Sequence, residues 1–332
     1  MWQADGVMLG VDVGGTKVAA ARVEGGRAHD RVEHPTDLDS AAELLDGIEA
    51  AVSEVVETAG APAAIGVGVP SQIDFAAGRV LSSVNIPLEG VPLRDELTRR
   101  LGVPVFVDND ANVAALAESA AAPGGPETDV VMLTLGTGVG GGVVTSDEVF
   151  RGASGLGAEL GHLVIDHQGP ECPGNCPSRG CIEAFCSGTA LARDATSFGR
   201  ANPQSALGRV VAERGHATGR DAVEAAREGD GGALGLLRRL GTMLGVGVAS
   251  IANAFEPHQI VIGGGLSKAG DLFLDMADRE LRARALPVIS ERVSLSPART
   301  GADAGVIGAG LLAAQEVARA EGRATTDVLE SR

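Results

Sequence analysis

The stretch that decides the fold is Val7–Val23, which has the sequence VMLGVDVGGTKVAAARV. Apolar residues run through Val7–Val13 and again through Val18–Val23, and both runs are typical of buried β-strands. Four residues stand between them, Gly14, Gly15, Thr16 and Lys17, and the two glycines favour a tight turn. The sequence therefore predicts a β-hairpin, with a further turn at Glu24-Gly25-Gly26.

The same plan returns about 120 residues later. Val130–Leu135 predicts a strand, Gly136-Thr137-Gly138 a turn and Gly140–Val144 a second strand. After each hairpin, strand-like and helix-like segments alternate, which favours an α/β fold. We expect helices at Ser40–Ala59, Leu93–Leu101, Ala111–Ala122, Ala222–Glu228, Gly231–Ala254 and Ala304–Ala320, and strands at Ile65–Val69, Val103–Val107 and Ile260–Ile262.

Length and charge limit the possible partners. The 332 residues suggest about two domains. Lys plus Arg is 27 and Asp plus Glu is 44, so the formal net charge is −17, which repels nucleic acid and anionic membranes. The longest uncharged stretches, Val130–Val144 and Leu240–Phe255, are shorter than a ~20-residue membrane span. The first residues lack a basic segment and include Asp5, so we expect no secretory signal and a cytoplasmic location.

Two glycine patterns resemble well-known nucleotide motifs but stand in the wrong context. Gly10–Lys17 is similar to a Walker A loop, yet the order is Thr-Lys and a strand follows. Gly136–Gly141 matches G-x-G-x-x-G, yet it also leads into a predicted strand. Both motifs require a helix whose N-terminus faces the phosphates, so we reject both interpretations.

The two turns still suit phosphate binding. Because they carry few bulky side chains, their backbone N–H groups can bind phosphate oxygens. Thr16 and Thr137 add hydroxyl donors, and Asp12 stands where a carboxylate can hold Mg²⁺. A third glycine run follows another predicted strand, at Gly263, Gly264 and Gly265. The alternative is that these are ordinary turns and that Lys17 is a solvated surface lysine.

An acidic segment follows the predicted strand Val103–Val107 and precedes a predicted helix. It reads Asp108-Asn109-Asp110-Ala111-Asn112. Ligands of open α/β sheets bind outside the carboxyl ends of the strands. A carboxylate there can accept a proton from a substrate hydroxyl, and a neighbouring amide can orient a sugar. The alternative is an Asx turn that caps the next helix.

The segment after the second hairpin combines carboxylates, an imidazole and thiols. Glu159 and His162 share a face if that turn is helical, and together with Glu183 they suit a ligand with many hydroxyls. One imidazole and three thiolates complete a structural zinc site: His162, Cys172, Cys176 and Cys181. The alternative is a set of buried free thiols. We interpret Cys186 as a small packing residue.

With these residues assembled, the chain resembles the ROK family of repressors, open reading frames and sugar kinases, and within it the bacterial glucokinases. The resemblance covers nearly the whole chain. It implies an α/β, actin-like ATPase (ribonuclease H-like) fold with two domains around a cleft. We expect a small domain of 1–112 plus 304–332 and a large domain of 113–303 with the zinc loop. The motifs are Asp12-Val-Gly-Gly-Thr-Lys17, Asp108-Asn-Asp-Ala-Asn112, Leu135-Gly-Thr-Gly-Val-Gly-Gly-Gly142, Ala158-Glu-Leu-Gly-His162 and Gly180-Cys-Ile-Glu183.

The resemblance also implies individual roles. Asp110 is then the catalytic base, and Asn109 orients the sugar. Glu159, His162 and Glu183 match the family's sugar ligands, with His162 shared by zinc. The ATP-binding residues implied are Asp12, Gly14, Gly15, Thr16, Lys17, Thr137, Gly138, Gly263, Gly264 and Gly265.

This sequence departs from the family pattern at two places. Its cysteines read C-x3-C-x4-C where the family has C-x-C-x4-C, so Cys172 must reach across an insertion. Ser71 and Gln72 stand where many members have Pro-Gly or Gly-Arg. That loop touches sugar in relatives, so the sugar preference stays open.

The implied activity is ATP-dependent phosphorylation of glucose at O6, the glucokinase reaction, by a homodimer or homotetramer. One alternative is a kinase for fructose, N-acetylmannosamine or N-acetylglucosamine, and polyphosphate as donor also stays open. The other is a non-enzymatic sugar sensor. The acidic motif at Asp110 and the short stretch before Asp12, too short for a DNA-binding segment, favour the enzyme.

Overall fold

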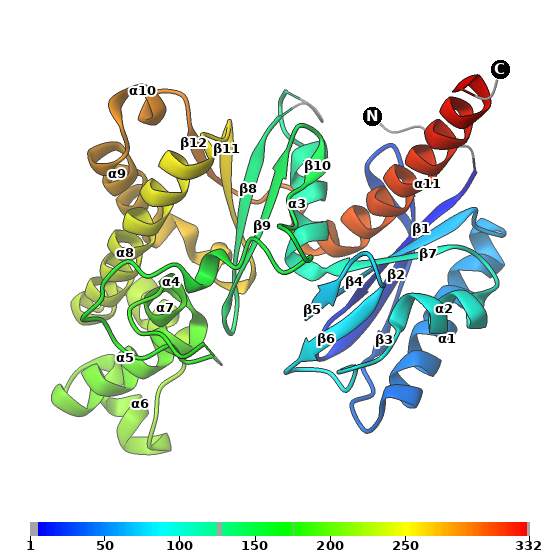
Figure 1. Cartoon of the computed structure of the whole chain (residues 1–332). Coiled ribbons are helices and arrows are strands. Elements are labelled where there is room, and N and C mark those ends of the chain that lie inside the picture. The colour runs from blue at the N-terminus through cyan, green and yellow to red at the C-terminus, as the bar shows by residue number, and fades with distance from the viewer. Residues whose placement is uncertain (1–5, 125–127, 175, 331–332) are drawn as a thin grey trace. The chain divides into compact units, whose positions relative to one another are not determined.

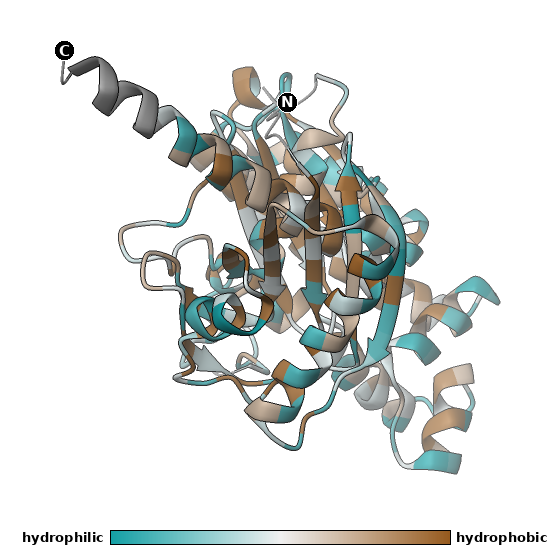
Figure 2. Cartoon of the chain, turned by 90° about the vertical axis from the view of Figure 1, so that its right-hand side faces the viewer, coloured by the Kyte–Doolittle hydropathy of each residue, from teal (hydrophilic) through white to brown (hydrophobic). Residues whose placement is uncertain are grey.

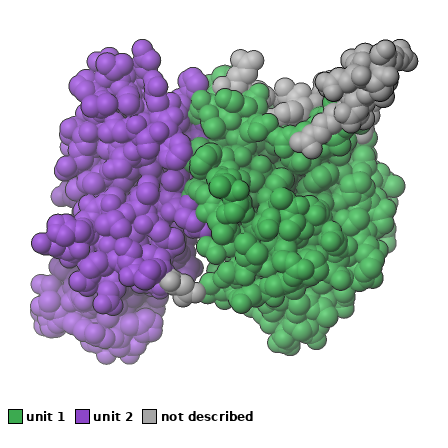
Figure 3. All heavy atoms as spheres, in the orientation of Figure 1, with its two compact units in different colours: residues 1–129, 142–158, 299–332 green, residues 130–141, 159–298 purple. Residues whose placement is uncertain are grey.

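The computed structural model describes residues 6–124, 128–174 and 176–330, with side chains as far as Gly322. The chain forms two compact units, coloured separately in Figure 3. Unit 1 comprises Met1–Asp129, Gly142–Ala158 and Arg299–Arg332; unit 2 comprises Val130–Gly141 and Glu159–Ala298. Beside this division by compactness, the domain boundaries drawn from the sequence stay a prediction.

Unit 1 is built on a sheet of order β3-β2-β1-β4-β7 (Figure 1). Strand β1 (Met8–Val13) pairs antiparallel with β2 (Lys17–Glu24), which confirms the predicted hairpin. Strand β3 (Arg27–Pro35), which the sequence analysis did not predict, pairs antiparallel with β2. Strands β1, β4 (Ala64–Val69) and β7 (Val105–Asn109) are mutually parallel neighbours, so their carboxyl ends lie at one edge of the sheet.

Helices cover both faces of this sheet. The large apolar side chains of β1 (Leu9, Val11 and Val13) pack in one cluster with α1 (Ala41–Ala59) and α2 (Leu93–Leu101). On the other face, α3 (Asp110–Ala120) and α11 (Ala304–Glu330) pack against the sheet and against each other. The predicted helix at the C-terminal end is therefore present and extends ten residues beyond Ala320. A small separate sheet of β5 (Ser71–Asp74) and β6 (Arg79–Ser83) was not predicted.

Glycines allow α11 to approach the sheet at backbone distance. A Cβ built on Gly10 would lie 1.8 Å from the carbonyl oxygen of Val306, and one on Gly66 would lie 1.8 Å from that of Ala309. On the helix itself, a Cβ at Gly308 would lie 1.6 Å from the carbonyl oxygen of Val113 in α3. A side chain at any of these positions would overlap a backbone atom, so only glycine fits.

Unit 2 contains most of a second sheet, of order β10-β9-β8-β11-β12. This order matches that of the first sheet, as the repeated hairpin in the sequence suggested. In each sheet, three strands that are consecutive in sequence lie side by side, and two later strands run parallel to the earliest of the three. The strands are β8 (Val130–Leu135), β9 (Val139–Thr145), β10 (Glu148–Val149), β11 (Gln259–Gly263) and β12 (Ser294–Pro297).

Helices make up the rest of unit 2, where α8 packs against α4, α5, α7 and α9. The predicted helices at 222–228 and 231–254 are confirmed as α7 (Gly219–Arg227) and α8 (Gly231–Phe255). The other helices were not predicted from sequence: α4 (Ile182–Cys186), α5 (Gly188–Ala201), α6 (Ala206–Arg214), α9 (Leu274–Arg284) and α10 (Pro287–Ser290). The 3₁₀ helices are η2 (Leu160–His162), η3 (Gly265–Leu272) and, in unit 1, η4 (Gly301–Asp303).

Helix α8 is the one described helix whose length and composition would allow it to cross a membrane. Half of its apolar window is buried inside the structure, as in the core helix of many globular proteins. Figure 2 shows bands of hydrophobic residues along the central strands. The length and composition of α8 are therefore weak evidence for a membrane span.

Replacing Gly66 by alanine tests the close contact of α11. The new methyl group would overlap the backbone oxygen of Ala309, which cannot rotate away. We expect Gly66→Ala to lower the free energy of unfolding by about 3 kcal/mol, measured by urea or thermal denaturation.

Gly47→Ala is the matched control, because Gly47 lies inside α1 with no atom within 4 Å of a built Cβ. Alanine is the better helix former by about 1 kcal/mol, so this variant should unfold at the same or a higher temperature than the wild type. Equal stability of Gly66→Ala and the wild type would contradict the packing described for α11.

Candidate functional site

The predicted residues of unit 1 gather at the carboxyl ends of its parallel strands. Asp12 lies near the end of β1, Asn109 ends β7, and Asp110 is the first residue of α3. Gly68 and Val69, at the end of β4, pair with Asp12 and Asn109 respectively. This edge of an open α/β sheet is where ligands bind.

Asp12 stands in an unusual electrostatic environment. A Cβ on Gly305, in the first turn of α11, would lie 2.3 Å from the carboxyl carbon of Asp12, so the helix packs directly on this side chain. Burial, and then the nearby carboxylate of Asp110, raise the pKa of Asp12 from 3.8 to about 6. Lys17 and Arg31 act in the opposite direction. A cation placed between the two carboxylates would relieve this repulsion.

The first glycine turn joins β1 to β2 with few side-chain atoms. It is closed by a hydrogen bond from the Gly14 N–H to the Lys17 carbonyl oxygen (2.9 Å), and Thr36 donates its hydroxyl to the Gly14 carbonyl oxygen (2.7 Å). Among the described residues, the N–H groups of Gly15 and Thr16 have no acceptor. A strand follows the turn, which confirms that this is not a Walker A loop.

Lys17 does not point freely into this turn. Its ammonium group pairs with Glu33 on the neighbouring strand β3, and its side chain is 48% exposed. Lys17 is therefore a surface lysine in this structure, as the alternative interpretation of the sequence expected. Its role at a phosphate stays a prediction.

Asn109 forms the Asx cap considered from the sequence and also contacts the Ser71 loop. Its side-chain oxygen caps α3 by accepting the N–H groups of Ala111 (2.9 Å) and Asn112 (3.4 Å). Its side-chain nitrogen donates to the carbonyl oxygen of Ser71 (3.2 Å), in β5. The Asx cap is therefore present, and the same side chain ties the segment of Asp110 to the Ser71 loop.

Ser71 and Gln72 differ in exposure. The hydroxyl of Ser71, a buried residue, bonds the hydroxyl of Ser83 (2.8 Å), whereas Gln72 is exposed. The predicted sugar-contacting role of this pair remains untested, but the bond from Asn109 places Ser71 beside the acidic segment.

Arg151 was not predicted from the sequence as part of the site. Its Nε–H donates to Asp108 (2.8 Å), a carboxylate that is only 2% exposed. Asp108 also accepts the N–H of Asn109 (2.8 Å) and the side-chain amide of Asn112 (2.9 Å), while the Arg151 guanidinium stacks 3.7 Å from the ring of Phe75. A buried Asp requires a cation or several hydrogen-bond donors as partners. Asp108 in the acidic motif could therefore have indicated that a residue such as Arg151 lies beside it.

Unit 2 brings the second and third glycine segments together. Gly264 (φ +83°) follows β11, and a Cβ there would lie 2.5 Å from the carbonyl oxygen of Leu135, at the end of β8. The second turn, Gly136–Gly138, follows Leu135 directly. Among the residues the structure describes, the N–H groups of Thr137 and Gly138 have no acceptor. The strand β9 follows, so the dinucleotide-binding interpretation is also correctly rejected.

Glu159 and His162 lie at the two ends of one 3₁₀ turn. Glu159 is the N-cap of η2, and the His162 N–H donates to the Glu159 carbonyl oxygen (3.1 Å). Residues three apart lie on the same side of a 3₁₀ helix. Ala158, just before this turn, has φ +65°, a conformation that a non-glycine residue holds at a cost of about 1 kcal/mol.

Glu183 links the predicted sugar residues to the second glycine turn. One of its carboxylate oxygens accepts the N–H of Val139 (2.8 Å), directly after that turn, and the other lies 3.3 Å from the Cys172 sulfur. A Cβ on Gly138 would come within 2.5 Å of this carboxylate, so the glycine is required for the contact.

The predicted zinc ligands converge in the folded chain. The ligand atoms of all four residues lie within 4.8 Å of one another: His162, Cys172, Cys176 and Cys181. The Cys172 sulfur is 3.8 Å from Nδ1 of His162. Ligand atoms of a tetrahedral zinc with bonds of about 2.3 Å are about 3.8 Å apart, so this donor set fits the metal. Cys172 lies within the cluster despite the longer spacing to Cys176.

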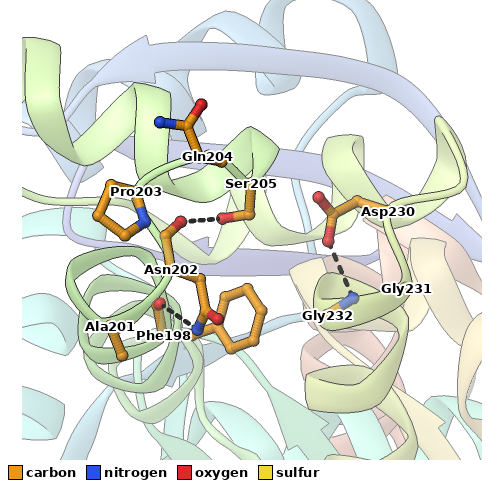
Figure 4. Close-up of a pocket in the computed structure, with 9 residues that line it drawn as sticks. All are labelled: Phe198, Ala201, Asn202, Pro203, Gln204, Ser205, Asp230, Gly231 and Gly232. Atoms are coloured by element: carbon orange, nitrogen blue, oxygen red, sulfur yellow. Dashed lines mark hydrogen bonds between the residues drawn. The ribbon is translucent and has the colours of Figure 1, made fainter.

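A pocket of unit 2 lies away from the predicted site residues. It measures about 590 Å³ and is lined by residues around the end of α5 and the starts of α6 and α8 (Figure 4). Asp230, its acidic residue, already accepts three backbone N–H groups, from Ala206 (3.0 Å), Gly232 (2.9 Å) and Ala233 (2.9 Å). These bonds lower the pKa of Asp230. The pocket contains none of the predicted site residues and suggests no chemistry.

Comparison with known proteins identifies the family independently. Residues 8–316 match the profile of the ROK family. The chain belongs to the ROK family. It is 36% identical over 314 residues to a glucokinase of Halalkalibacterium halodurans, an alignment that covers 93% of this chain and 95% of that protein.

Solved structures of ROK proteins have the same fold. The chain is similar to a ROK hexokinase from Thermus thermophilus (TM-score 0.79, 34% identity), covering 94% of this chain and 99% of that one. It is also similar to a ROK family glucokinase from Streptomyces griseus in complex with glucose and AMPPNP (TM-score 0.78, 35% identity), covering 93% and 100% respectively. These ROK structures confirm the predicted actin-like α/β fold.

The raised pKa of Asp12 makes the stability of this ROK protein depend on pH. The folded state holds the Asp12 proton more tightly than the unfolded state, so stability is lost as pH rises from 3.8 through about 6. Without divalent cations, we expect Asp12→Asn to be more stable than the wild type at pH 7.5 by on the order of 3 kcal/mol. The difference should disappear near pH 4 in melting curves.

Asp271→Asn removes an exposed carboxylate and serves as the control, with the same melting temperature as the wild type at both pH values. A lower melting temperature for Asp12→Asn at pH 7.5 would show that the Asp12 carboxylate is stabilised rather than destabilised where it lies.

Proposed function

We propose that this protein is an ATP-dependent sugar kinase that transfers the γ-phosphoryl group of ATP to O6 of glucose. The observation that carries the proposal is Asp110 at the carboxyl ends of the parallel strands, close enough to Asp12 to raise its pKa. The ROK relatives named glucokinase, at 35–37% identity, support the sugar and the donor. So does the ROK glucokinase solved with glucose and AMPPNP.

In this proposal Asp110 is the general base. Its carboxylate accepts the proton of the sugar 6-hydroxyl while that oxygen forms a bond to the γ-phosphorus and the bond to the β-phosphate oxygen breaks. ADP leaves, and the proton remains on Asp110 until solvent takes it. Because phosphoryl transfer has a loose transition state, positioning and charge neutralisation supply most of the rate. Asn109, fixed by its contacts to α3 and Ser71, positions the segment.

The glycine turns bind the phosphates in this scheme. The N–H groups of Gly15, Thr16, Thr137 and Gly138 are unused donors in the described structure and suit phosphate oxygens. Asp12 fits a Mg²⁺ site because a divalent cation would offset the repulsion from Asp110, and bound Mg²⁺ neutralises the phosphate charge. Gly263, Gly264 and Gly265 are assigned to the adenosine side.

The sugar ligands proposed are Glu159, His162 and Glu183. With Nδ1 of His162 facing the thiols, its Nε2 remains for a sugar hydroxyl. Zinc bound by the four-residue cluster has a structural role: it holds the loop between His162, at the end of η2, and Glu183, in α4. Because four protein ligands fill the tetrahedron, no position remains for chemistry at the metal.

Asp110→Asn tests the general base. The amide keeps the size of the side chain but accepts no proton, so we expect kcat to fall by about 10²–10⁴-fold in a coupled ADP-release assay. Glucose binding, measured by calorimetry, should change little. A variant that keeps most of its activity would exclude Asp110 as the base.

Metal analysis tests the zinc site. We expect about one zinc per chain in protein purified without chelators, and loss of most of it in Cys181→Ser. Cys186→Ala is the control, because this buried cysteine is not one of the four clustered residues and its thiol contacts the Leu240 carbonyl oxygen. Zinc-free wild-type protein, purified gently, would exclude the site.

A panel of hexoses assayed with ATP separates the alternatives. Glucose should give the highest kcat/KM among glucose, fructose, N-acetylmannosamine and N-acetylglucosamine. The uncommon Ser71-Gln72 pair is the reason to test the others. Sugar binding without ADP release would favour the sensor, and activity with polyphosphate would widen the donor range. Cytoplasmic location and a dimeric or tetrameric state stay predictions.

A further inference from the structure

The N-terminus of α5 grips the second glycine turn through backbone and side-chain donors. The Gly188 N–H donates to the carbonyl oxygen of Gly136 (2.8 Å). Thr189 donates both its N–H (3.3 Å) and its hydroxyl (2.8 Å) to the carbonyl oxygen of Thr137. The next N–H of the helix, of Ala190, bonds the capping hydroxyl of Ser187 (3.0 Å). The first three N–H groups of α5 are thus occupied, so this helix end offers no N–H group to an anion. We call Gly188 and Thr189, which bond the turn, the clamp.

The clamp determines where the N–H groups of the turn point. In a trans peptide, the carbonyl oxygen of one residue and the N–H of the next point in opposite directions, and the described chain contains no cis peptide. Because the Gly136 carbonyl faces α5, the Thr137 N–H points away from it. Because the Thr137 carbonyl faces Thr189, the Gly138 N–H also points away. These two N–H groups have no acceptor among the described residues.

The hydroxyl of Thr189 makes the shorter of the two bonds to the Thr137 carbonyl, and it is the clamp's side-chain contribution at that oxygen. Thr189 itself is exposed, so its side chain adds little to the core of unit 2. Gly188 must be glycine-like in size, since a Cβ there would lie 2.9 Å from the Gly136 oxygen. The hydroxyl is therefore the part of the clamp that a substitution can remove without disturbing packing.

We propose that Thr189 is a positioning residue for nucleotide binding: its hydroxyl holds the Thr137–Gly138 peptide so that the Gly138 N–H faces a phosphate of the nucleotide. This inference rests on the proposed function, because it takes the second turn as a phosphate site. Thr189 lies outside the glycine motifs, and its effect is limited to the binding of the nucleotide.

The test compares Thr189→Val, which keeps the shape and removes the hydroxyl, with Thr189→Ser, which keeps the hydroxyl. We expect Thr189→Val to raise KM for ATP about three- to tenfold, as for the loss of one neutral hydrogen bond, and to leave KM for glucose and the melting temperature unchanged. Thr189→Ser should restore KM for ATP to within about twofold of the wild type. Thr242→Val, which removes a helix-surface hydroxyl bonded to Arg238, is the control and should match the wild type throughout.

Calorimetry with ATP alone separates failure of this inference from failure of the proposed function. Wild-type protein that binds ATP but phosphorylates no sugar would refute the kinase, and weaker ATP binding by Thr189→Val would then still support the clamp. Unchanged ATP affinity in Thr189→Val, identical behaviour of the valine and serine variants, or an equal rise in KM for glucose would each overturn the inference. Wild-type protein that binds no ATP would overturn both.

Discussion

The contact between the backbone of α11 and the sheet of unit 1 is the constraint on which the acidic end of that unit depends. Gly10 and Gly66 have no side chains, so the helix lies directly on the strands. Asp12 is the next residue on the same face of β1, since side chains alternate along a strand, and it therefore meets Gly305 at the start of α11. The packing that stabilises the fold thus also buries the Asp12 carboxylate near Asp110, and this burial raises the pKa of Asp12.

In unit 2, by contrast, the candidate site residues contact one another directly. Glu183 accepts the N–H of Val139 beside the second glycine turn and also lies against Cys172 in the zinc-ligand cluster. The N-terminus of α5 bonds the carbonyl oxygens of Gly136 and Thr137 in that turn. Under the proposed function, a change among the predicted zinc ligands is therefore expected to reach the second glycine turn through Glu183.

Both hairpins and the longest helices followed from periodicity and glycine placement because their local signals are strong, whereas the actin-like architecture was implied by the resemblance to the ROK family. Strand β3 was missed because RAHDRVEHP is polar, and only pairing with β2 makes it a strand. Of the site, the thiol cluster was predictable from chemistry within a short segment. Arg151 and Thr189 were not, because their partners lie 43 and 52 residues away in sequence and no local pattern reports such contacts.

In the proposed reaction, a carboxylate at the strand ends of unit 1, that of Asp110, promotes phosphoryl transfer from ATP to a sugar hydroxyl. Phosphorus NMR of the protein with Mg²⁺, ATP and glucose observes this transfer directly. The proposed reaction requires that the γ-phosphate signal of ATP be replaced by that of a sugar phosphate monoester, identified as glucose 6-phosphate, with an equal amount of ADP. Unchanged ATP, or release of inorganic phosphate with no sugar phosphate, would contradict it.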